Sequence, residues 1–306
     1  MSTLTTLTRY FQGPGALRFG VASALTAAVA LLVVTAGNAA PGTPDGRVYG
    51  WRAPLGQGSA TSFADLEEGG APRAIGVMLS ADALATLPKE PSDYHHCFDR
   101  DGDGATAQAT ECIHTHEIVI PLPDAVTQRG DVPFSWVLLN WNLNGHMPPG
   151  IYDVPHFDVH FYIASIEDTF AIQDGPCGPE YVACDDYAMA KMPVPSNLMH
   201  SDFKDVDAVA PAMGNHLIDV DGHEFHGQGF TSSWIYGVYG GKVTFWEQMI
   251  ALSYLESRPN MCAPIKVPPA VEVAGYYPTQ RCIRYDAGAD AYAVSLEQFT
   301  YREAAR

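Results

Sequence analysis

Histidine and aspartate side chains gather in one short stretch of the chain, residues 145–162. From residue 154 onward the stretch alternates between apolar and polar residues, as a β-strand with two different faces does. The two faces would carry Phe157, Val159, Phe161 and Ile163 on one side and His156, Asp158, His160 and Tyr162 on the other. Side chains on one face of a strand repeat about every 7 Å, and imidazole and carboxylate groups bind divalent metals. The stretch therefore predicts a metal site on one face of a strand.

Two other segments offer further ligands. Glu247 belongs to a predicted strand over residues 242–250, and an inward-facing Glu247 would need a cation, an imidazole or a hydroxyl as a partner. The alternative is that Glu247 faces solvent because Trp246 is the buried residue. His216 follows Gly214 and is flanked by apolar residues. This setting fits two roles equally well: an inward-facing ligand at the end of a strand, or a structural or surface histidine.

Several remaining histidines lie in predicted loops. His146 follows a glycine and precedes a Pro-Pro-Gly turn, from which it could fold back as a ligand or a catalytic base. His223 and His226 come after the Asp221-Gly222 turn signal, so we expect them to be structural or surface residues. The mixture of imidazole and carboxylate suits Zn, Fe, Mn, Ni or Cu, and ligand type alone does not choose among these metals.

A separate acidic run resembles a calcium loop. Asp99, Asp101 and Asp103 occupy its first, third and fifth positions, and Gly104 occupies the sixth, where a sharp turn is needed. Glu111 comes one residue after the position at which an EF-hand has its glutamate. We expect a structural calcium site outside an EF-hand, with an acidic surface turn as the alternative.

The six cysteines fall into pairs that are close in sequence. The pairs are Cys97/Cys112, Cys177/Cys184 and Cys262/Cys282. Six cysteines allow 15 connectivities, and pairing between sequence neighbours is the simplest of them. Because the chain has no C-x-x-C motif, disulfides are favoured over zinc thiolates.

The N-terminal part of the chain predicts export. Residues 20–37 form an uncharged apolar run that ends on small residues, so residues 1–40 are interpreted as a secretory signal, with an uncleaved membrane anchor as the alternative. The whole chain has 17 basic against 35 acidic side chains. This balance argues against nucleic acid or anionic lipid as a partner. We therefore expect a secreted, periplasmic or cell-envelope protein with no membrane attachment after cleavage.

Short predicted strands separated by Pro- and Gly-rich turns indicate a mainly β domain. The strands are expected at 73–80, 116–121, 134–141, 154–164, 233–239 and 242–250, with helical turns at 81–87 and 250–257. Gly240-Gly241 fits a two-residue hairpin turn. We expect a flexible arm over 41–72 and one β-rich metal-binding domain over 73–306. It would be a cupin-like or calycin-like barrel or a sandwich, with long disulfide-pinned loops and few short helices.

The motifs together resemble an uncharacterised domain family of exported bacterial proteins. The resemblance rests on G-H-x-P-P-G-x-Y-D-x-P-H-F-D-x-H-F-Y (145–162), M-G-x-H (213–216), F-x-E-x-M (245–249) and the segment 76–88. It covers roughly residues 73–256 and implies a β-rich fold that forms homo-oligomers. It also implies that His146, His156, His160, His216 and Glu247 stand at motif positions. The resemblance implies no particular activity, because the family has no settled one. A looser similarity is to cupins, although the spacing here is His-x-x-x-His rather than His-x-His.

Two functions of different classes are consistent with these residues. One is a metalloenzyme in which a metal with an open position activates water or oxygen. The other is a non-catalytic envelope protein whose metal and calcium sites are closed. An enzyme of this kind should have three protein ligands beside a pocket, whereas a closed site should have four ligands and no pocket.

Overall fold

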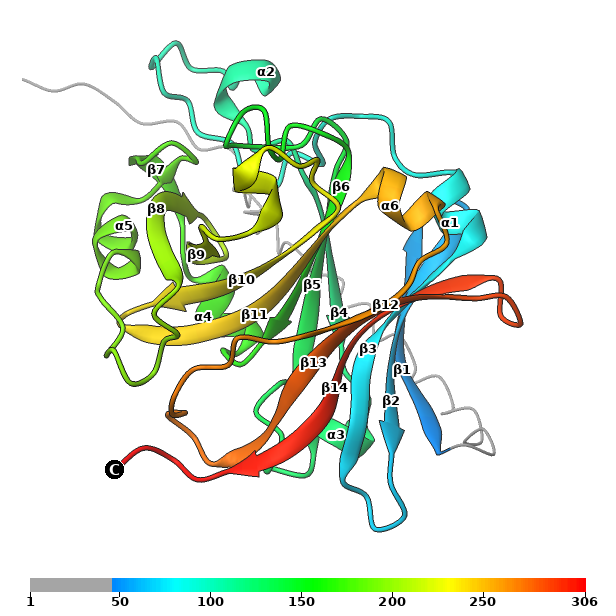
Figure 1. The fold of residues 1–306 in the computed structure, drawn as a ribbon. Coiled ribbons are helices and arrows are strands. Elements are labelled where there is room, and N and C mark those ends of the chain that lie inside the picture. Colours follow the sequence, from blue (N-terminus) through cyan, green and yellow to red (C-terminus); the bar gives the residue numbers. More distant parts are fainter. Residues whose placement is uncertain (1–45) are drawn as a thin grey trace, which may run out of the picture. The chain divides into compact units, whose positions relative to one another are not determined.

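The computed structural model describes residues 46–306, which form two antiparallel β-sheets with a few short helices (Figure 1). The six-stranded sheet has the order β1 (Arg47–Leu55), β2 (Gly58–Leu66), β3 (Pro72–Ser80), β14 (Ala291–Arg302), β13 (Gly275–Asp286) and β12 (Asn260–Pro264). The seven-stranded sheet has the order β4 (His116–Pro121), β5 (Trp136–Asn142), β6 (His156–Tyr162), β11 (Lys242–Ala251), β10 (Ser232–Tyr239), β9 (Gly214–Asp219) and β8 (Phe203–Ala210). The predicted signal segment, residues 1–40, lies outside the described residues.

The remaining elements are short and belong to the connections. They are α1 (Ala81–Ala85), α2 (Gln108–Glu111), α3 (Asp124–Thr127), α4 (Ile166–Phe170), β7 (Asp174–Cys177), α5 (Cys184–Ala190), the 3-10 turn η1 (His223–His226) and α6 (Leu252–Glu256). Among residues 46–306, no helix has the length and apolar character needed to cross a membrane.

The main hydrophobic core lies between the two sheets. Phe157, Val159 and Phe161 of β6 belong to the same buried cluster as Ile75 and Val294 of the other sheet. Neither sheet closes on itself, since β1 and β12 are the edges of one and β4 and β8 the edges of the other. The sandwich prediction therefore fits the structure, whereas the barrel prediction, cupin-like or calycin-like, fits it less well.

The prediction of a flexible arm over residues 41–72 does not match the part of this range that the structure describes. Residues 47–66 form β1 and β2, two strands of the six-stranded sheet. The prediction interpreted small residues as a linker, but Ala60 and Ala64 are fully buried and Phe63 is almost so. Small side chains fit where strands pack closely against a second layer, so composition alone misled the prediction.

Other predicted element boundaries are confirmed to within two residues. Strands occur at each of the six predicted positions, and helices occur at 81–85 and 252–256. Gly240 and Gly241 have φ values of 59° and 75°, as a two-residue hairpin turn between β10 and β11 requires. The long hairpin of β13 and β14 was not predicted, because its alternation is interrupted by arginines, glutamines and tyrosines that face solvent only in part.

All three disulfides join the predicted pairs. Cys97–Cys112, Cys177–Cys184 and Cys262–Cys282 close segments with sequence separations of 15, 7 and 20 residues. No free cysteine remains among the described residues. Disulfides of this kind form in oxidising compartments, which is consistent with the prediction of export.

Candidate metal centre

The polar face of β6 lies on the side of the seven-stranded sheet that is turned away from the main core. His156, Asp158 and His160 are buried there, at 0%, 5% and 1% exposure. Strand register places neighbours beside them, since β5 and β11 flank β6 and Glu247 pairs directly with His160. Both Trp246 and Glu247 are buried, because β11 is covered on both faces. The alternative of a solvent-facing Glu247 is therefore wrong, because the burial of Trp246 on one face of β11 does not expose Glu247 on the other.

His160, His216 and Glu247 form the first group of candidate ligands. The Nε2 atoms of His160 and His216 lie 3.6 Å and 3.9 Å from Oε2 of Glu247. One ligand atom from each residue lies within 4.8 Å of the others. Two ligands bound tetrahedrally at zinc–nitrogen distances of 2.0–2.1 Å are separated by about 3.3 Å. The three side chains are thus spaced as ligands of one metal ion are.

Hydrogen bonds to backbone carbonyl groups fix the tautomers of these histidines. Nδ1 of His160 donates to Leu138 O at 3.1 Å, and Nδ1 of His216 donates to Ala208 O at 2.9 Å. A carbonyl oxygen only accepts, so each Nδ1 carries the hydrogen and each Nε2 presents a lone pair. This is the arrangement by which proteins orient metal-binding histidines.

The electrostatics of the group favour a bound cation. Burial lowers the pKa of His160 to about 3 and that of His216 to about 4, so both imidazoles are neutral at physiological pH. Burial, together with the charge of Asp158, raises the pKa of Glu247 well above its usual range. Nε2 of His160 and Oε2 of Glu247 are both buried without a hydrogen-bond partner. A buried carboxylate that faces two imidazole lone pairs is costly unless a cation lies between them.

An aromatic ring supports both histidines of this group. The ring centroid of Phe245 lies 4.8 Å from that of His160 and 5.1 Å from that of His216. Phe245 occupies the space above Gly237, its cross-strand partner, where an added Cβ would lie 2.0 Å from the ring. Gly237 is therefore required for the packing that positions the two imidazoles.

His146, His156 and Asp158 form a second group, so the single cage predicted from the sequence is divided in two. Nε2 of His146 lies 3.4 Å from Oδ2 of Asp158, and Nε2 of His156 lies 3.2 Å from Oδ1. Asn142 donates to Oδ2 of Asp158 at 2.7 Å and orients the carboxylate. Nδ1 of His156 donates to Val154 O at 2.7 Å, so its Nε2 is the ring nitrogen that faces Asp158.

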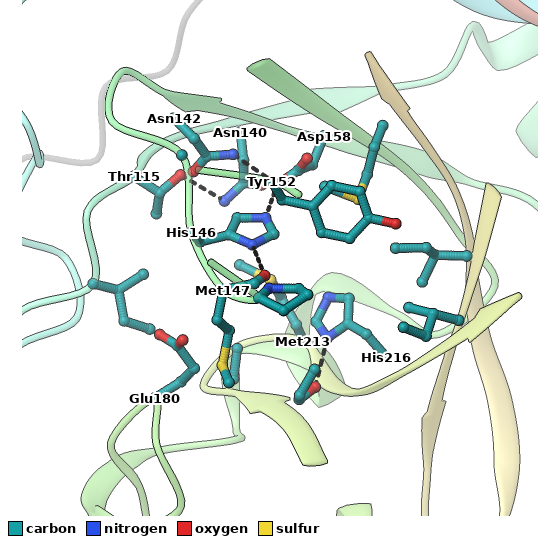
Figure 2. Close-up of a pocket in the computed structure, with 18 of the residues that line it drawn as sticks. Thr115, Asn140, Asn142, His146, Met147, Tyr152, Asp158, Glu180, Met213 and His216 are labelled. Carbon is teal, nitrogen blue, oxygen red and sulfur yellow. Dashed lines mark hydrogen bonds and ion pairs between the residues drawn. The ribbon is translucent and has the colours of Figure 1, made fainter. Parts of the chain in front are cut away.

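A cavity of about 610 Å³ adjoins both groups. Figure 2 shows His146, Asp158 and His216 around it, and Glu247 also lines it. Most of the wall is apolar: Ile113, Met147, Pro148, Ile151, Val206, Ala208, Ala210, Met213, Ile218, Val220, Phe225, Ile235 and Met249. Neither Lys nor Arg occurs among the described residues that line it. The cavity has the size and lining of a small-molecule site.

The acidic loop is arranged only in part as predicted. Carboxylate oxygens of Asp99, Asp101 and Asp103 lie within 4.8 Å of one another. Glu111 does not join them, because its Oε1 accepts from the backbone N–H of Arg100 and Asp101 and its Oε2 from that of Ala107. Glu111 therefore stabilises the loop conformation through backbone hydrogen bonds, and the calcium site stays a prediction.

The structure adds residues that sequence reasoning missed. Asn140 and Asn142 on β5 line the cavity, and their positions opposite Asp158 and His156 follow from register, which no short motif reveals. Glu180 lies on another wall, apart from the labelled histidines in Figure 2, and burial raises the pKa of its carboxyl group. His223 and His226 lie in η1, outside both ligand groups, as the sequence had indicated.

Comparison of the chain with protein-family models, with curated proteins and with solved structures found no match. The resemblance to a family of exported bacterial proteins stays a prediction from the motifs alone.

Proposed function

We propose that this protein is an exported metal-dependent enzyme. His160, His216 and Glu247 would hold a divalent transition metal, with Zn, Fe, Mn, Ni and Cu all compatible with the ligand types. When bound, such a metal supplies Lewis acidity that activates water or oxygen. The protein contributes two neutral imidazoles, the buried carboxyl group of Glu247 and a cavity next to them.

The observation that carries the proposal is a group of three ligands beside a cavity. Among the described residues, the group consists of His160, His216 and Glu247. His216 and Glu247 also line the cavity. Three protein ligands with an open position are typical of catalytic zinc, whereas structural zinc has four protein ligands. This favours the enzyme over the closed, non-catalytic envelope protein, which is the alternative.

The cavity wall indicates the class of substrate. Asp158, Glu180 and Glu247 are the acidic residues of a wall that has no Lys or Arg among the described residues. An anionic substrate would meet carboxylates with no lysine or arginine to balance them. We therefore infer a neutral, largely apolar small molecule as the substrate, with one polar group directed toward the metal.

The test compares the mature protein, loaded in turn with each of the five metals, with its His160→Ala and Glu247→Gln variants. The measurements are hydrolysis of neutral aryl esters and lactones, and oxygen consumption with neutral aromatic substrates. His226→Ala, which changes an exposed histidine outside both groups, is the matched control. We expect one metal to support turnover in the wild type and the control, with at least a 100-fold loss in the two variants. Equal rates in the wild type and His160→Ala across all metals and substrates would overturn the proposal.

A further inference from the structure

The second ligand group holds no metal in the function proposed above. His156 and Asp158 come from β6, but His146 comes from the connection between β5 and β6, residues 143–155. Its ring centroid lies 4.6 Å from that of His156. The loop thus brings His146 to the N-terminal end of β6, as a third polar side chain beside His156 and Asp158.

The buried atoms of this group lack partners. Nε2 of His156 and Oδ1 of Asp158 are both buried and form no hydrogen bond, although they lie 3.2 Å apart. Nδ1 of His146 lies 2.7 Å from Met147 O and donates to it, which leaves its Nε2 facing Asp158. One ligand atom from each of the three residues lies within 4.8 Å of the others, and the Asn142 amide holds the carboxylate in place.

We propose that His146, His156 and Asp158 form a second divalent-metal site, which ties the 143–155 loop to β6 beside the cavity. The site takes a metal that accepts two imidazoles and one carboxylate. The competing arrangement is an ion pair in which protons on the histidines take the place of the metal. Geometry favours the metal, because the Nε2–Oδ distances of 3.2 Å and 3.4 Å are long for charged hydrogen bonds and ordinary for two ligands of one ion.

The loop is held differently at its two ends. In the C-terminal half of the loop, Tyr152 is buried, and its hydroxyl oxygen lies 3.1 Å from both Oε1 of Glu224 and Oγ of Ser233. In the N-terminal half of the loop, the His146 side chain reaches Asp158 of β6 and is 35% exposed. Loop residues line the cavity, namely Gly145, His146, Met147, Pro148, Ile151 and Tyr152. A metal at this point would therefore hold one wall of the cavity in place.

The first test measures metal stoichiometry by mass spectrometry and by titration of the metal-free protein with Zn²⁺ and Co²⁺. We expect two equivalents in the wild type and in the His226→Ala control, and one equivalent in His146→Ala, His156→Ala and His160→Ala. One equivalent in the wild type that only His160→Ala removes would overturn the second site and leave the proposed function standing. One equivalent in the wild type that only His146→Ala and His156→Ala remove would support the second site and overturn the proposed function.

The second test measures hydrogen exchange of the loop in the folded protein. Metal removal should increase exchange at residues 145–152, and His146→Ala should show the increase even when metal is present. His160→Ala should leave exchange of the metal-loaded loop unchanged. Identical loop exchange in the metal-loaded wild type, the metal-free wild type and His146→Ala would contradict a metal tie, and would favour the ion pair.

Discussion

His160 and Glu247 lie directly opposite each other on β6 and β11, with Nε2 of one 3.6 Å from Oε2 of the other. This separation is too long for a hydrogen bond, although both atoms are buried. Two facing polar atoms that stay just out of bonding range leave space for a third atom between them. His216 approaches the same oxygen from β9, so the position is surrounded by three potential ligands.

Replacing Glu247 should have opposite effects in the presence and absence of metal. In the metal-free protein, Glu247→Gln should raise the free energy of unfolding by about 1 kcal/mol, because the neutral amide avoids the cost of burying or protonating a carboxylate whose pKa is raised on folding. With metal at 100 times its dissociation constant, the wild type should gain about 2.7 kcal/mol and the variant should gain much less. Urea unfolding with and without metal measures both effects, with exposed Glu167→Gln as the control. An equal gain in the wild type and Glu247→Gln would contradict this role.

Gly237→Ala should disturb the first ligand group through Phe245. The new Cβ would lie 2.0 Å from the Phe245 ring, which is fully buried and has little room to move. Overpacking of this kind costs about 1–3 kcal/mol. Metal affinity should fall as well, since the ring contacts both His160 and His216. Gly229→Ala is the control, because no atom lies within 4 Å of its added Cβ. Unchanged stability and affinity in Gly237→Ala would refute the support assigned to Phe245.

His96 should make stability depend on pH in the alkaline range. Burial alone would lower its pKa, but hydrogen bonds to Asp174 and Glu117 raise the pKa to about 10. The folded protein therefore keeps a proton that the unfolded chain loses above a pKa of about 6.5. This contribution is complete below about pH 6.5 and is lost as the pH rises through about 10, with a slope of at most about 1.4 kcal/mol per pH unit.

The check is urea unfolding of the wild type and His96→Gln at pH 6, 7, 8 and 9. The difference in free energy of unfolding between the two proteins should shrink steadily from pH 7 to pH 9. A difference that stays constant over this range would show that the ion pairs of His96 do not persist in solution.

Calcium should bind the acidic loop independently of the histidine groups. Asp99, Asp101 and Asp103 offer oxygen ligands, which calcium prefers and which soft transition metals do not. We expect millimolar Ca²⁺ to raise the melting temperature of the wild type and of His160→Ala, but not that of Asp101→Asn. Thermal unfolding with Ca²⁺ and with Mg²⁺ measures this. The same increase in Asp101→Asn would indicate an acidic surface turn without a calcium site.

The sequence predicted some parts of the candidate site and not others, for physical reasons. Alternation along residues 156–162 was enough to place three polar side chains on one face, because a strand has a period of two. The division into two groups depends on the path of the 143–155 loop and on the register of β9, which local patterns do not determine. Similarly, the small residues of β1 and β2 resemble a linker until a second layer covers them.

Anomalous diffraction from crystals of the protein tests the central claim most directly. The protein should be purified without chelators, and data should be collected on both sides of the absorption edge of the metal that elemental analysis finds. The account predicts a peak bonded to Nε2 of His160, Nε2 of His216 and a carboxylate oxygen of Glu247, each at about 2.0–2.2 Å. Direct contact of these three side chains with no metal peak between them, in crystals soaked with that metal, would contradict it.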